Sequence, residues 1–83
     1  MIKAFGEHQP DIAASAFVSE TALVMGNVSI GENSGVWPGA VIRGDFAKIS
    51  IDDHVIIEDN CVVHSGEDLT IGAHVIVGHG AVI

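Results

Sequence analysis

The sequence predicts an all-β solenoid, a parallel β-helix whose three flat sides form a triangular prism. Three observations lead to this prediction. Aliphatic residues recur every six positions, a small side chain follows most of them four positions later, and Asn or Gly often lies between the two. A helix would need apolar spacings of three and four, and a flat strand would alternate along its whole length, so neither fits.

The six-residue period defines the coils. The aliphatic positions are Ile12, Val18, Val24, Ile30, Val36 and Ile42, then Ile51, Ile57 and Val63, then Ile71, Val77 and Ile83. Three six-residue units make one coil, so these positions give about four coils, stacked at roughly 4.8 Å. The period breaks twice, at Arg43–Ser50 and His64–Thr70, and we expect both segments to be loops that project from corners of the prism.

Two further sets of residues complete each unit. Small or modest side chains that we expect to point inward are Ala16, Ala22, Val28, Ser34, Ala40, Val55, Cys61, Val75 and Ala81. Residues that we expect at the tight corners, because Asn and Gly adopt a left-handed backbone most easily, are Asn27, Asn33, Gly39, Asn60, Gly66 and Gly80.

Composition narrows the class of protein. The 83 residues carry three basic and eleven acidic side chains, a formal charge of −8, which argues against nucleic acid and anionic membrane surfaces as partners. No apolar run approaches the roughly 18 residues that span a bilayer, and no signal peptide is evident. We expect one domain, residues 1–83, in the cytoplasm.

The coil assignment places candidate functional residues on faces. Arg43 and His64 each follow an inward aliphatic residue on the same side of successive coils, so they should stack, and position 84 would be next in that column. His79 lies on the neighbouring side, two residues after Val77. Spacing alone leaves structural and metal-binding roles for His64 and His79 equally open.

Three motifs carry a family resemblance over essentially the whole chain: "VWPGAVIRGD", "IIEDNCVVH" and "IGAHVIVGHGAVI". They resemble the γ-class carbonic anhydrases and their carbonic anhydrase/acetyltransferase-like relatives. The resemblance implies a left-handed β-helix that assembles as a homotrimer with zinc at each subunit interface. Two histidine ligands would come from one subunit and the third from its neighbour.

The resemblance also implies roles for individual residues. His64 and His79 match two of the zinc ligands, and Arg43 and Asp45 match a structural salt bridge across the subunit interface. Trp37 is expected to cover an outer face or a subunit contact.

Glu58 and Asp59 match the catalytic polar pair of the family, and here the sequence departs from the pattern. Glu58 stands where the family has glutamine, and an ionised carboxylate can only accept a hydrogen bond. The implied chemistry is attack of a zinc-bound hydroxide on carbon dioxide, a small-molecule substrate, to give bicarbonate.

The family's second histidine of "GHxxxxHG" would fall at position 84, beyond Ile83. The sequence is therefore interpreted as the N-terminal part of such a protein, with weak or absent hydratase activity. Zinc is the expected cofactor, with another divalent metal or no bound metal as the alternatives. The open last coil also predicts end-to-end pairing of trimers.

Two other functions remain open at this stage. Hexapeptide-repeat acyltransferases bind acetyl-coenzyme A between subunits with a histidine as general base. A trimeric scaffold without catalysis is the other. A shift of the melting temperature with coenzyme A, with a divalent metal, or with neither separates the three.

Other polar residues have simpler interpretations. His54 and His74 should stack at an outer corner as solvated turn residues, and His8 should lie on the surface. Cys61 should be a buried structural thiol.

Overall fold

The computed structural model describes all of residues 1–83, and every regular element in it is a β-strand. The strands are β1 (Ile2–Lys3), β2 (Asp11–Ile12), β3 (Phe17–Val18), β4 (Leu23–Ile30), β5 (Gly35–Val36), β6 (Val41–Ile51), β7 (Ile56–Ile57), β8 (Val62–His64), β9 (Leu69–Ile71) and β10 (Ile76–Val77). No helix with a length and hydropathy suited to spanning a membrane is found.

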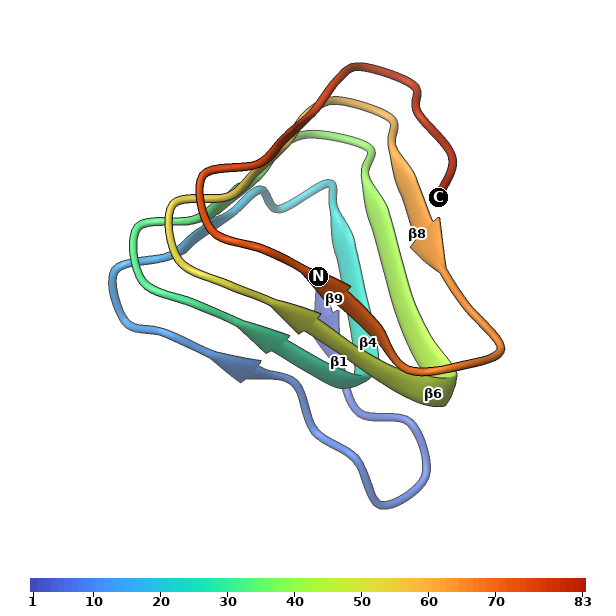
Figure 1. The fold of residues 1–83 in the computed structure, drawn as a ribbon. Coiled ribbons are helices and arrows are strands. Elements are labelled where there is room, and N and C mark those ends of the chain that lie inside the picture. The colour runs from blue at the N-terminus through green and yellow to red at the C-terminus, as the bar shows by residue number, and fades with distance from the viewer.

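The strands wind into a triangular β-helix of about four coils, as predicted (Figure 1). In this view the chain runs clockwise while it approaches the viewer toward its C-terminal end, which is the left-handed sense. All pairings between named strands are parallel. The left-handed course is the uncommon one, because crossovers between parallel strands are normally right-handed.

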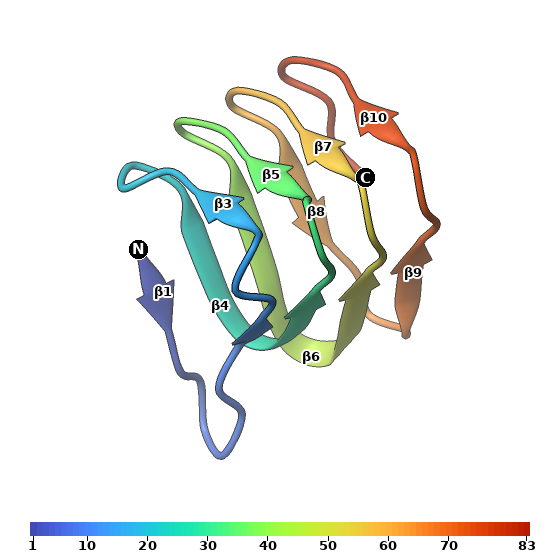
Figure 2. The same ribbon diagram turned by 90° about the vertical axis from the view of Figure 1, so that its left-hand side faces the viewer.

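Three walls enclose the core. The first wall contains β2, β9 and the C-terminal halves of β4 and β6, and the second contains β3, β5, β7 and β10, which lie side by side in Figure 2. The third wall contains β1, β8 and the N-terminal halves of β4 and β6. We call the corners after the first, second and third walls the first, second and third corners.

The register of the walls confirms the predicted coils. The aliphatic columns are Ile12–Ile30–Ile51–Ile71 in the first wall, Val18–Val36–Ile57–Val77 in the second and Val24–Ile42–Val63 in the third. An isolated parallel bridge between Val62 and Val82 continues the third wall into the last coil. The six-residue period therefore predicts which residues are neighbours across coils.

A single apolar core of 15 buried residues runs along the prism axis. It combines the aliphatic columns with the small inward residues, most of which are buried as predicted. The exceptions lie in the first and last coils, where Ala16 and Ala81 are half-buried and Val75 is 40% exposed. Ile49 and Leu69, which follow the two breaks in the period, pair with each other across coils and pack inward as well.

Buried polar groups within this core have partners. The Ser34 hydroxyl donates to the Asp52 carbonyl (2.8 Å) and accepts from the Val55 amide (3.0 Å). The Cys61 thiol is fully buried and donates to the Gly78 carbonyl at 3.0 Å, which confirms its structural role. No buried side-chain nitrogen or oxygen lacks a hydrogen-bond partner, as stability requires of groups removed from water.

The first and second corners turn through residues with positive φ. Asn33, Gly39, Asn60 and Gly80 behave as predicted. His54 (φ 55°) and His74 (φ 64°) take the same conformation at the first corner. The prediction was wrong for Asn27 and Gly66, neither of which has a positive φ. Next to Asn27, the third corner of β4 turns at Gly26 instead, with φ 83°. A Cβ on Gly26 would collide with the carbonyl oxygen of Gly44 in the next coil.

Side chains also cross between coils at the corners. The Asp53 carboxylate leans over the preceding coil, where its Oδ1 accepts the Glu32 amide hydrogen at 2.8 Å. A Cβ on Gly31 would collide with this carboxylate. The carbonyl group of Asp52 would also lie only 2.7–2.8 Å from such a Cβ, so Gly31 is small because both the Asp53 side chain and the Asp52 backbone occupy the space above it.

The two breaks in the period differ from each other. The segment Arg43–Ser50 was predicted to be a loop, but it lies within the continuous strand β6, which bends around the third corner. Gly26 pairs with Gly44 and Val28 with Ile49, so the extra residues bulge outward while both sides stay hydrogen-bonded to β4. The second break is a connection as predicted, but a shorter one: residues 65–68 connect β8 and β9, while His64 belongs to β8 and Leu69 and Thr70 belong to β9.

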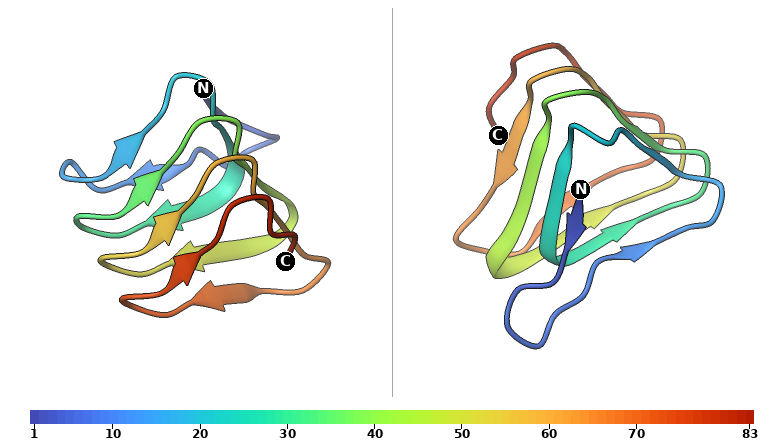
Figure 3. Two further views of the ribbon diagram at one scale, coloured as in Figure 1. Left: turned by 90° about the horizontal axis from the view of Figure 1, so that it is seen from above. Right: turned by 180° about the vertical axis from the view of Figure 1, so that it is seen from behind.

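Residues 1–10 cover part of the N-terminal end, which the period did not predict. β1 pairs with Val24 and Met25 of β4, and a turn at Gly6 follows (Figure 3, right). The chain then folds back through a bridge between Phe5 and His8.

The core predicts how unevenly substitutions affect stability. Ile57→Ala, at a fully buried side chain, should lower the free energy of unfolding by about 2–5 kcal/mol because it leaves a cavity between stacked coils. Ile76→Ala, at a side chain that is 68% exposed, should have a much smaller effect. Urea unfolding followed by circular dichroism measures both, and equal losses would contradict the assignment of inward and outward positions.

Candidate functional site

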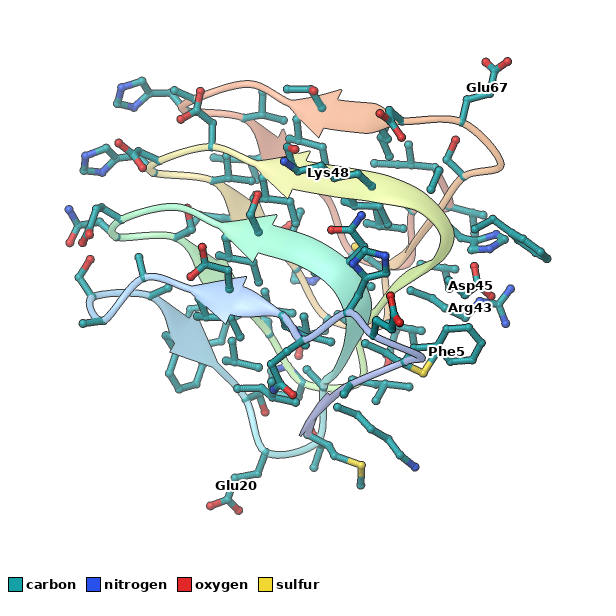
Figure 4. All side chains as sticks on the ribbon, turned by 90° about the horizontal axis from the view of Figure 1, so that it is seen from below. Phe5, Glu20, Arg43, Asp45, Lys48 and Glu67 are labelled. Atoms are coloured by element: carbon teal, nitrogen blue, oxygen red, sulfur yellow. The ribbon has the colours of Figure 1, made fainter.

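Three polar residues meet near the third corner, and we call them the His64 group. Arg43 in β6 is the register partner of His64 in β8. Between them, Asp45 Oδ1 accepts a hydrogen bond from His64 Nε2 at 2.8 Å, and Asp45 Oδ2 lies 3.2 Å from Arg43 Nε. Figure 4 shows Arg43 and Asp45 together at this edge of the molecule. The predicted stack of Arg43 and His64 is thus confirmed, and it is linked by a carboxylate.

The electrostatics of Asp45 follow from these contacts. Partial desolvation raises the pKa of its carboxyl, but hydrogen bonds from His64 and from the Phe46 amide and the charges of Arg43 and His64 outweigh that effect. The pKa of Asp45 therefore lies below its ordinary value of 3.8. Arg43 and Asp45 form an ion pair within the chain, and the bridge between subunits that the family resemblance implied stays a prediction.

Phe46 is a neighbour of this group that sequence reasoning missed. Its side chain is 82% exposed, and its ring centroid lies 6.2 Å from that of His64. The sequence did contain a signal that Phe46 is exposed, because it lies among the residues that interrupt the six-residue period. Inserted residues at a solenoid corner point away from the core.

A second group lies at the second corner, and we call it the His79 group. The Glu58 carboxylate lies 3.7 Å from His79 Nε2, and the Asp59 carboxylate lies 3.6 Å from His79 Nδ1. These separations are too long for hydrogen bonds. His79 is 71% exposed, so its ring is accessible from outside.

Trp37 lies one coil below Glu58 at the same corner. The Trp37 amide bonds to the Ile57 carbonyl and the Glu58 amide to the Val77 carbonyl, which places Trp37 and Glu58 in one column. The indole packs against Phe17 with centroids 5.1 Å apart and remains 41% exposed. An apolar surface therefore adjoins the His79 group.

The two groups stand at opposite edges of the third wall. His64 follows Asp59 by five residues, and five residues of extended strand span up to about 16 Å. Within one chain no three His, Cys, Asp or Glu side chains gather closely enough to hold a metal ion. The imidazole and carboxylate groups are suitable donors for zinc, but each group alone supplies only part of a ligand set.

The remaining histidines lie apart from both groups. His54 and His74 stack at the first corner with ring centroids 5.0 Å apart and planes inclined by 5°, as predicted. His8 is exposed near the N-terminus, also as predicted.

Comparison with known proteins links this fold and these motifs to a family. The chain is 41% identical over 91 aligned residues to the "Uncharacterized transferase YtoA" of Bacillus subtilis, covering all of this chain and 53% of that protein. It is 46% identical over 74 residues to the "Probable carbonic anhydrase" of Methanocaldococcus jannaschii, covering 87% of this chain and 46% of that one. The chain thus spans about half the length of these curated relatives.

A solved structure agrees with these relatives. The crystal structure of a hexapeptide transferase family protein from Anaplasma phagocytophilum matches with a TM-score of 0.94 and 37% identity. The match covers 98% of this chain and 48% of that protein. No family model matches the sequence.

The lowered pKa of Asp45 predicts a pH dependence. A carboxylate whose folded-state pKa is depressed stabilises the fold above its unfolded-state pKa, and that contribution is lost as the pH falls through the folded-state pKa. Asp45→Asn should therefore be less stable than the parent protein near neutral pH, and the difference should shrink below about pH 3.8.

Urea unfolding of both proteins at several pH values measures this difference. Glu67→Gln, which removes the same charge from an exposed side chain, is the control and should show no comparable change. A gap between parent and Asp45→Asn that stays constant down to strongly acidic pH would contradict the assigned role of Asp45.

Proposed function

This chain belongs to the γ-carbonic anhydrase-like, hexapeptide-repeat family, and from that premise we propose that it supplies metal-binding residues to a hydratase site between subunits. The substrate would be carbon dioxide, and the metal would be zinc. The observation that carries the proposal is the placement of the His64 and His79 groups at opposite edges of one wall.

A homotrimer explains this placement. In a ring of three subunits packed through their third walls, the edge that carries His64 in one subunit can face the edge that carries His79 in the next. Such a heterologous contact repeats three times and closes. The two groups, which cannot meet within one chain, would then form one site.

The outward side chains of the third wall suit such a contact. Its central outward column is apolar, with Leu23, Val41, Val62 and Val82 in register. The corresponding column of the first wall is polar, with Asp11, Ser29, Ser50 and Thr70. The difference favours the third wall over the first as the subunit interface, because apolar surface gains most from being covered.

The residues have distinct roles in this proposal. His64 and His79 would hold the metal, which when bound supplies the Lewis acidity that lets water react near neutral pH. Asp45 orients the His64 ring through its hydrogen bond to Nε2, the arrangement that commonly fixes a metal-binding imidazole, and Arg43 holds Asp45. Glu58 and Asp59 can accept a proton beside His79.

Acyl transfer is the second candidate, because two of the matched proteins bear the word transferase in their names. Coenzyme A carries several phosphate charges and needs cationic partners. This chain offers only Lys3, Arg43 and Lys48, and Arg43 is already paired with Asp45. The shortage of free cations favours the hydratase within these 83 residues. A rise in melting temperature with coenzyme A and none with zinc would reverse this preference.

The proposed assembly predicts the effect of charge on the third wall. The protein should be a trimer in solution, and Val41→Lys should break it into monomers because it places a cation in the apolar column. Ser50→Lys, the same substitution type on the first wall, should leave the trimer intact. Light scattering coupled to size exclusion measures the mass of each, and a monomeric parent protein would remove the basis for a shared site.

The proposed metal site predicts a graded zinc affinity. If the register of the bridge between Val62 and Val82 continues, a histidine and a glycine added after Ile83 would extend the His64 column. This addition should tighten zinc binding at least tenfold, equivalent to about 1.4 kcal/mol. His64→Ala should abolish the gain.

Isothermal titration with zinc measures these affinities. The titrations should use a background in which His54 and His74, at the first corner, are replaced by asparagine, so that no other histidine pair contributes. If the added histidine leaves the affinity unchanged, the proposed column is wrong. If neither zinc nor coenzyme A stabilises the protein, the scaffold interpretation replaces the enzymatic one.

A further inference from the structure

The first corner carries a histidine pair that the proposed function does not use. His54 and His74 occupy equivalent positions in successive coils, with ring centroids 5.0 Å apart and planes inclined by only 5°. Both residues belong to exposed turn segments, so the rings are accessible to solvent. The corner keeps the backbones of the two residues in fixed positions, because their amides bond to the Glu32 and Asp53 carbonyls of the preceding coil.

The fold itself does not require histidine at these positions. Both residues have positive φ, a conformation that is strained for most side chains and easiest for Gly and Asn. Asn33 fills the same position one coil earlier, and the second corner uses Gly39, Asn60 and Gly80. Histidine is itself among the residues enriched at positive φ, so the backbone tolerates the pair without requiring it. Because asparagine serves this turn equally well, the stacking of two imidazoles in successive coils points to a role for the imidazoles.

The charge around the pair favours a cation. Glu32, Asp52 and Asp53 lie in the turn segments of the same corner, and no lysine or arginine forms an ion pair with them. Two of these carboxylates fix the corner itself through hydrogen bonds: Asp53 Oδ1 accepts from the Glu32 amide and Asp52 Oδ1 from the Asp53 amide, both at 2.8 Å. The corner therefore combines two exposed imidazoles with unneutralised negative charge.

We propose that His54 and His74 form a surface site for a divalent transition metal, with water completing the coordination. The corner supplies no third protein ligand, so the site is a two-imidazole chelate. To form it, both rings turn about their Cβ–Cγ bonds until one nitrogen of each points at the ion between them. Imidazole ligands and the general order of divalent affinities predict that Cu²⁺ binds most tightly, ahead of Ni²⁺ and Zn²⁺.

Copper and nickel titrations of the 83-residue protein test this site. His54→Asn and His74→Asn are matched variants, because asparagine already occupies this position and conformation at Asn33. Either substitution should weaken Cu²⁺ and Ni²⁺ binding at least tenfold, since a chelate loses its effect when one arm is removed. His8→Asn, at an exposed histidine outside both proposed sites, should leave this binding unchanged.

Spectroscopy of the unsubstituted protein gives an independent measurement. The electron paramagnetic resonance spectrum of one equivalent of bound Cu²⁺ should show coupling to two imidazole nitrogens, and to one in either variant. Added Cu²⁺ should broaden the nuclear magnetic resonance signals of His54 and His74 before those of other residues. Unchanged Cu²⁺ affinity in the variant that carries both His54→Asn and His74→Asn, or Cu²⁺ binding that depends on His64 instead, would overturn the proposal. The hydratase site is tested separately, by the zinc titration.

Discussion

Every coil of this protein must repeat the path of the coil before it, and most of the structure follows from that constraint. Parallel hydrogen bonds join each wall to the next coil, and the aliphatic columns stack beneath them. A shift of one residue in a wall would turn its inward side chains outward. The sequence therefore keeps aliphatic residues at inward positions, small residues near the corners, and residues that tolerate positive φ at the turns.

The same constraint explains where chemistry can be placed. Inward positions are committed to packing, so reactive side chains stand on the outer face or at corners. Equivalent positions in successive coils bring side chains into columns, which is how Arg43 meets His64 and how His54 meets His74. The column geometry also keeps His64 and His79 apart within one chain, because they belong to different positions of the repeat. A site that uses both needs a second copy of the chain.

Much of this could be predicted from the sequence, since period and register are properties of residue order. The columns of Ile51, Ile57 and Val63 required only counting. Other features depend on how neighbouring groups compete for space and for hydrogen bonds, which the six-residue period does not show. The segment after Arg43 remains in a strand because its ends keep their hydrogen bonds to β4, and the third corner turns at Gly26 because the Gly44 carbonyl leaves no room for a Cβ. The Asp45–His64 hydrogen bond depends on how the inserted residues bulge, so the motif alone predicted the residues but not their contact.

The contact between Asp53 and Gly31 has a consequence for how such a sequence can change over generations. The side chain is not the only obstacle, because a Cβ on Gly31 would also lie 2.7 Å and 2.8 Å from the carbonyl carbon and oxygen of Asp52, which belong to the backbone of the next coil. A smaller residue at position 53 would therefore not make room for a larger one at position 31. Glycine at position 31 is fixed by the path of the neighbouring coil, so descendants of this sequence can vary at position 53 while position 31 stays the same.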